Sequence, residues 1–150
     1  MAWVETDGGR AAAGFEGETR DCVTRAIAVA TGRPYREVYE ELRRRAKLRA
    51  ESYRGTKKAF KSPRIGVHRE IYQPYLEALG WAWTPTMKVG QGCKVHLCAE
   101  ELPEGRLIVA VSRHLCAVVD GVVHDAFDPT RRGRRCVYGY YQKTRSNDNG

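Results

Sequence analysis

No stretch of the 150-residue chain approaches the roughly 18 apolar residues that a membrane-spanning helix needs. The first ten residues, MAWVETDGGR, lack the basic and then apolar order of a secretion signal. We therefore expect a cytoplasmic protein that has no membrane partner. Internal repeats are also missing, and the only biased segment is the tail TRSNDNG, which we expect to be frayed.

Cysteine is present in an odd number, five, so the cysteines cannot all be paired within one chain. Without an export signal we expect mostly reduced thiols rather than a disulfide framework, with at least one thiol free for another role. A metal site is an alternative, with candidate ligands in and near the segment CKVHLC: Cys93, His96, Cys98 and either Cys116 or Cys136. Alternation along the strand expected here places Cys93 on one face and His96 and Cys98 on the other. We therefore expect core cysteines, no metal and no cofactor.

The apolar content predicts one folded domain. Hydrophobic residues make up 42% of the chain, enough for one core in 150 residues. We expect a single domain over residues 1–150, with an ordered core at about 15–142 and a frayed tail at 143–150. After an N-terminal helix, a second is expected from Pro34 and a third over about Arg69 to Leu79, followed by short runs rich in β-branched and aromatic residues. This order predicts an α+β fold in which N-terminal helices precede an antiparallel sheet.

The segment TRDCVTRAIAVATGRP, residues 19–34, predicts the first helix. Thr19 can cap its start, and Gly32 with Pro34 ends it. Four small or branched residues have the spacing of a buried stripe: Val23, Ala26, Ile27 and Ala30. Cys22 then lies in the first turn, where unpaired amides and the helix dipole favour the thiolate and can stabilise an oxyanion.

The segment HLCAVVDGVVHDAFDPT, residues 114–130, predicts a β-hairpin that brings an acid to a histidine. Its Asp-Gly dipeptide at 120–121 is a strong signal for a two-residue turn, which sets the register of both strands. In that register His114 lies opposite Phe127 and one diagonal step from Asp125, within reach of a hydrogen bond. A carboxylate in this place fixes the imidazole tautomer and stabilises the imidazolium, as a general base requires.

These segments together suggest a catalytic group. Cys22 would be the nucleophile, His114 the base and Asp125 the orienting acid, with Cys22 Sγ within about 3–4.5 Å of a His114 ring nitrogen. Alternation places His124 and Asp128 on the other face of the hairpin, although Asp128 is near a strand end, where alternation can fail.

The run DCVTRAIAVATG, a histidine leading a strand and an acid on the next strand resemble the papain-like superfamily of cysteine peptidases and amidases in its compact bacterial forms. Those forms include bacteriocin-leader peptidases, peptidoglycan endopeptidases and amidases, and transglutaminase-like proteins. The resemblance covers the order of elements over about residues 15–142. It implies a papain-like fold with Cys22, His114 and Asp125 in the three roles above. It also implies cysteine-dependent hydrolysis or acyl transfer at an amide, peptide or isopeptide bond of a peptide, protein or peptidoglycan.

The same resemblance leaves alternatives open. HLCAVVDGVVHDAFDPT is also similar to a transglutaminase-like stretch ending in DPT, which favours Asp128 as the acid, whereas the histidine used by many peptidoglycan enzymes keeps His124 as an option. Papain-like peptidases commonly place an oxyanion-hole glutamine six residues before the cysteine, and this chain has Glu16 there. An ionised carboxylate cannot donate a hydrogen bond, so Thr19 or first-turn backbone amides would take that role. If a phage encodes the chain, lysis or injection machinery could carry it to a bacterial cell wall.

The formal charge of +8 supports a competing class of function. Much of the excess lies in residues 43–64 and 131–135, which could bind nucleic-acid phosphates with a steep salt dependence. Charged runs more often solvate a helix face or a loop. The alternative is a catalytically silent binding module, with nucleic acid as its partner, and we assign His68 to the surface without a role. Five aromatic residues could line a groove, although we expect most in the core: Trp81, Trp83, Tyr138, Tyr140 and Tyr141.

Overall fold

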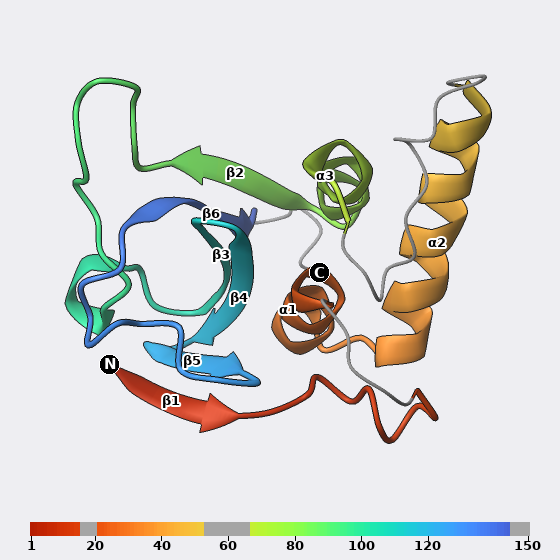
Figure 1. Cartoon of the computed structure of the whole chain (residues 1–150), viewed down its shortest axis with the longest axis horizontal. Coiled ribbons are helices and arrows are strands. Elements are labelled where there is room, and N and C mark those ends of the chain that lie inside the picture. Colours follow the sequence, from red (N-terminus) through yellow and green to blue (C-terminus); the bar gives the residue numbers. More distant parts are fainter. Residues whose placement is uncertain (16–20, 53–66, 145–150) are drawn as a thin grey trace.

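The computed structural model describes residues 1–15, 21–52 and 67–144. Its helices are α1 (Cys22–Thr31), α2 (Tyr35–Ser52) and α3 (Arg69–Ala78), with one short 3₁₀ turn at Ala99–Glu101. Its strands are β1 (Ala2–Glu5), β2 (Trp81–Pro85), β3 (Arg106–Val111), β4 (His114–Val119), β5 (Val122–Asp125) and β6 (Val137–Lys143). The helices gather beside one face of a curved sheet (Figure 1), so the architecture is α+β, as predicted. No helix in these ranges has the length and apolar character that crossing a membrane requires.

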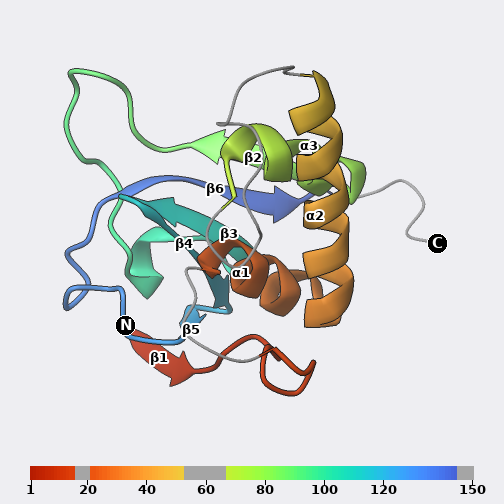
Figure 2. The ribbon, with the colours of Figure 1, turned by 45° about the vertical axis from the view of Figure 1, so that its right-hand side comes forward.

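Helix α1 is the central helix of the fold. It packs against β3, β4 and β5 on one side and against α2 on the other (Figure 2). The predicted stripe is confirmed, because all four of its residues are buried: Val23, Ala26, Ile27 and Ala30. The helix starts at Cys22 after Asp21 and ends at Gly32, whose φ of 73° is the left-handed conformation that glycine adopts readily. The predicted cap Thr19 lies outside the described residues.

The other two helices follow the predicted order. Helix α2 starts one residue after Pro34 and continues into the charged run as far as Ser52, and α3 ends one residue before the predicted Leu79. Helix α2 contacts α3, and α3 contacts β2. Helices α1 and α3 therefore lie against the sheet and α2 packs on their outer side (Figure 1), with α1 closest to the strands that carry the candidate histidine and acid.

The sheet has the order β1-β5-β4-β3-β6-β2 and is mixed rather than wholly antiparallel. Strand β1 precedes the helices and pairs parallel with β5, so the predicted antiparallel sheet is wrong at this edge. The backbone carbonyl of Asp125 accepts hydrogen bonds from Thr6 N at 2.9 Å and from Trp3 Nε1 at 3.2 Å. A four-residue strand has too few residues for a clear sequence period, and only the distant partner β5 stabilises it as a strand.

The predicted hairpin between β4 and β5 is confirmed. Val119 pairs with Val122 across a two-residue turn in which Asp120 and Gly121 have φ values of 47° and 78°. Both are positive, as a type I′ turn requires. The paired register runs to Ala117 and His124, and β5 ends one residue later at Asp125.

The segment CKVHLC differs from its prediction. The segment forms no regular strand. Its one described β-bridge is an isolated one between His96 and Cys136. Cys93 and Cys136 form a disulfide, so the expectation of reduced thiols is wrong for this pair. The alternation of side chains along a strand does not apply to a loop. The disulfide forms because Cys136, just before β6, lies beside this loop. Among the described cysteines, Cys22, Cys98 and Cys116 are free, and of these only Cys116 is buried.

Apolar residues pack on both faces of the sheet. The helices cover one face, where Ile108, Leu115, Ala117 and Tyr141 join the helical core. The other face contacts the loop before β3 through Leu97 and Leu102. Of the five aromatic residues considered above, Trp81 and Tyr141 are buried in the core as expected, whereas Tyr138 is 41% exposed.

We expect Gly139→Ala to destabilise the protein by about 1–3 kcal/mol. The indole of Trp83 lies directly over Gly139, and a Cβ there would be 2.3 Å from Trp83 Cζ2 and 2.7 Å from the Thr84 carbonyl oxygen. Urea unfolding would measure the loss, with Lys143→Ala on the exposed end of the same strand as the control. Equal stability of Gly139→Ala and the wild type would show that Trp83 lies elsewhere.

Candidate functional site

Helix α1 places the Cys22 thiol at its start. The side chain is half-buried, and burial alone would raise its pKa. A hydrogen bond and charge interaction with His114, a hydrogen bond to the Leu115 backbone and the charge of Arg25 outweigh that effect, so the pKa of Cys22 is lowered. As the first helical residue it also benefits from the positive end of the helix dipole. The structure thus stabilises a thiolate at this position.

His114 starts β4 and lies between a thiol and a carboxylate. Its Nε2 is 2.5 Å from Asp125 Oδ2, so the predicted hydrogen bond is present. Burial lowers the pKa of His114, but the hydrogen bonds and charges of Asp125 and Cys22 outweigh burial and raise it to about 9. The ring also lies against Phe127, with centroids 5.0 Å apart. The lowered pKa of Cys22 and the raised pKa of His114 both shift the pair towards thiolate and imidazolium.

Asp125 is almost fully buried, at 2% exposure, and both of its carboxylate oxygens have donors. Oδ2 faces His114, while Oδ1 accepts from the Ala126 backbone at 2.7 Å and from Arg25 Nη2 at 3.1 Å. A buried carboxylate with several donors is held in one orientation. Asp125 therefore holds the His114 ring in place.

A second buried acid extends this network, and the sequence analysis did not identify it. Asp21 is 1% exposed, pairs with Arg25 and accepts a hydrogen bond of 2.6 Å from the Tyr35 hydroxyl. Burial and the bond to Asp21 raise the pKa of Tyr35, so it stays protonated and donates. Arg25 thus connects the residue before Cys22 to Asp125. Arg25 lies three residues after Cys22, about one helical turn on, and this spacing was the sequence signal that could have identified it.

The alternative site residues lie elsewhere or outside the described ranges. Asp128 is exposed, its Oδ1 accepts from Thr130 N at 2.9 Å, and this bond lowers its pKa. His124 alternates with buried Asp125 and points to the other side of β5, as predicted. Thr19, the side chain proposed for the oxyanion, and Glu16, which occupies the position of the family's oxyanion glutamine, fall outside the described residues.

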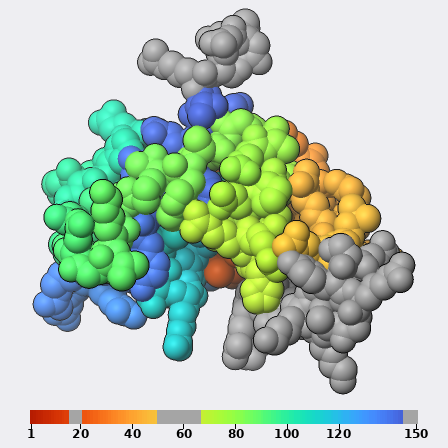
Figure 3. All heavy atoms as spheres, turned by 90° about the horizontal axis from the view of Figure 1, so that it is seen from above, coloured from red at the N-terminus to blue at the C-terminus, as the bar shows by residue number. Residues whose placement is uncertain are grey.

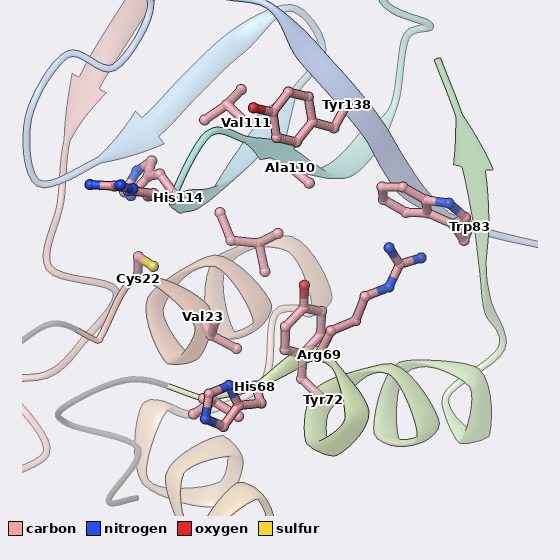
Figure 4. A pocket seen from close by; sticks show the side chains of 13 residues that line it. Cys22, Val23, His68, Arg69, Tyr72, Trp83, Ala110, Val111, His114 and Tyr138 are labelled. Atoms are coloured by element: carbon pink, nitrogen blue, oxygen red, sulfur yellow. The ribbon is translucent and has the colours of Figure 1, made fainter. Parts of the chain in front are cut away.

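A pocket of about 520 Å³ opens beside the cysteine. Cys22 and His114 lie at one end, and Arg69 and Trp83 lie at the other (Figure 4). From outside, Figure 3 shows red-orange atoms at the start of α1 in a hollow between α3 and the blue-green strands. His68 is exposed, as predicted, and it also lines this pocket. A ligand in this pocket would reach the Cys22 thiol.

The basic segment in α2 gives less support to the competing function. Within α2, Arg44 and Arg45 both pair with Glu41, and Arg49 pairs with Glu70. These pairs neutralise part of the segment 43–64, whose second half lies outside the described residues. In the part of the chain that the structure describes, no three His, Cys, Asp or Glu side chains are grouped as a metal ion would need.

Comparisons of the chain with protein families, curated proteins and solved structures give no match. The functional argument therefore depends on the geometry of Cys22, His114, Asp125 and the pocket.

Replacing the two candidate acids should affect His114 differently. In Asp125→Asn we expect the His114 pKa to fall from about 9 towards 6.5, because the carboxylate is a main cause of its rise. Asp128→Asn should leave it unchanged, and Asp125→Ala should impair activity more than Asp128→Ala. An NMR titration of the histidine rings would measure both pKa values. A larger drop in Asp128→Asn would show that the transglutaminase-like alignment is the better guide.

Two arginines in i,i+4 ion pairs provide a matched test of the buried network. Arg25→Gln leaves Asp21 buried without its cation and removes one of the two cationic partners of Asp125, so we expect a loss of about 3–5 kcal/mol. Arg33→Gln removes an exposed pair with Glu37 and should cost less than about 1 kcal/mol. Arg25→Gln should also slow alkylation of Cys22 near neutral pH, since the Arg25 charge helps to lower the Cys22 pKa. Equal effects of the two changes in urea unfolding would contradict a structural role for the Arg25 network.

Proposed function

We propose that this protein is a cysteine-dependent hydrolase or acyl transferase of papain-like type that acts on an amide, peptide or isopeptide bond. The observation that carries the proposal is the Cys22 thiol at a helix start, interacting with a His114 ring that is hydrogen-bonded to buried Asp125. The adjoining pocket supports it, because a substrate there would meet the thiol. Cys22 is the nucleophile, His114 the acid and base, and Asp125 the orienting acid.

In the first half of the reaction the Cys22 thiolate attacks the carbonyl carbon of the scissile bond. The carbonyl oxygen takes the negative charge and is stabilised by backbone amides in the first turn of α1, which have no partner within the helix. His114, protonated at neutral pH, gives its proton to the leaving amine as the carbon–nitrogen bond breaks. The products are a free amine and a thioester on Cys22.

In the second half His114, now neutral, takes a proton from the incoming nucleophile. Water gives hydrolysis, and an amine gives acyl transfer; either one displaces the Cys22 thiolate and restores the starting state. Since His114 must donate a proton in the first half, turnover should fall as the pH rises through about 9, where the ring loses that proton.

Cys22 should react with iodoacetamide at about pH 6.5 well before the other free cysteines, since the thiolate fraction and access control the rate. Burial and Glu101 raise the pKa of Cys98 to about 11, and burial raises that of Cys116. His114→Ala should slow the labelling of Cys22 by about tenfold, because the imidazolium partner is lost. Peptide mass spectrometry would follow each cysteine.

His124→Ala is the matched control, because His124 lies on the neighbouring strand and points away from Asp125. Its Cys22 should label at the wild-type rate. A Cys22 as slow as Cys116, or one indifferent to His114→Ala, would mean that the thiol only packs, and a binding module would become the better explanation. Cleavage of a fluorogenic peptide-amide library by the wild type, but not by Cys22→Ser, would then test the reaction itself.

A further inference from the structure

The end of the pocket opposite Cys22 has a fixed cation. The guanidinium of Arg69 lies over the Trp83 indole, 4.2 Å from its centroid, and its Nε donates to Gln73 Oε1 at 2.6 Å. The Trp83 indole packs against Tyr141, with ring centroids 4.8 Å apart, and lies over Gly139, where a side chain would displace it. An arginine stacked in this way loses little further freedom when it binds an anion.

The charges around the pocket have one sign. Apart from the reactive pair Cys22 and His114, the pocket is lined by the arginines Arg69 and Arg113, and none of its thirteen lining residues, all within the described ranges, is an aspartate or glutamate. In those ranges Arg69 and Arg113 form no ion pair with a carboxylate, unlike Arg44, Arg45 and Arg49 of α2. An arginine that has no carboxylate partner and is stacked on an aromatic ring is suited to bind a carboxylate through two parallel hydrogen bonds.

We propose, as an extension of the function above, that the substrate is an acidic acyl compound whose carboxylate binds Arg69 while its scissile carbonyl lies at Cys22. Figure 4 shows the two groups at opposite ends of the same pocket, so one substrate would span both. The class comprises peptides or amides with a glutamyl-like or aspartyl-like side chain, or a free carboxylate, a short distance from the bond that is attacked.

A nucleic-acid ligand fits this pocket less well. Single-stranded nucleic acids bind to aromatic faces on which bases stack, and here Arg69 already covers the Trp83 face. Tyr72, which also lines the pocket, is nearly buried at 9% exposure and packs edge-on to Tyr141. Besides the exposed ring of Tyr138, the pocket offers a cation at a distance from a nucleophile, which matches an acid within a small acyl substrate.

Two reactive probes that differ only in charge test the proposal: iodoacetyl-Gly-Glu-amide and iodoacetyl-Gly-Gln-amide. After correction for their rates with 2-mercaptoethanol, Cys22 should prefer the glutamate probe by about fivefold at low salt. The preference should shrink in about 1 M NaCl, which screens exposed charges. Arg69→Gln should abolish it and Arg69→Lys should keep part of it. Arg134→Gln, which removes an exposed charge outside the pocket, should leave it intact.

Failure of this inference and failure of the proposed function give different results. If iodoacetamide labels Cys22 rapidly but the two probes react equally, or Arg69→Gln keeps the preference, the acidic-substrate inference is overturned and the nucleophile stands. If Cys22 does not react with any reagent, the proposed function fails. NMR titration of the Trp83 indole signal with acetyl-Gly-Glu-amide and acetyl-Gly-Gln-amide then decides the inference. A larger shift with the glutamate compound supports it, and equal shifts overturn it.

Discussion

The buried carboxylate of Asp125 is the group on which both the fold around the site and its chemistry depend. Removing an ion from water costs several kcal/mol unless it is paired and hydrogen-bonded. Asp125 meets that cost with donors from β4, α1 and its own strand end, through His114, Arg25 and the Ala126 amide. Its carbonyl also accepts two hydrogen bonds from the N-terminal segment that contains β1. The N-terminal segment, α1 and β4 therefore meet at the end of β5.

Charges of opposite sign alternate through this cluster. Asp21, Arg25, Asp125 and His114 follow one another, and the Cys22 thiol lies beside the last. Such an arrangement keeps the imidazole protonated, as its raised pKa shows, and an imidazolium lowers the pKa of the thiol. The interactions that stabilise the buried acids thus also prepare the proposed nucleophile.

A second set of contacts shapes the pocket at the end opposite Cys22. Gly139 leaves room for the Trp83 indole, and the indole supports Arg69, which faces the pocket from α3. The reactive pair comes from α1 and β4, whereas the proposed specificity comes from α3 and β2. Because Arg69 makes none of the hydrogen bonds described for Asp125, a change at Arg69 would alter the proposed specificity without removing a partner of Asp125.

Local patterns were sufficient for several features. Helical spacing identified α1 and its buried stripe, and the Asp-Gly turn set the register that placed Asp125 beside His114, because both depend on neighbouring residues. The assignments of β1, the Cys93–Cys136 disulfide, the Arg25–Asp125 pair and the Arg69 platform came only from the tertiary structure. Each joins segments far apart in the chain, or depends on burial that compensates charge, and no local period records such contacts.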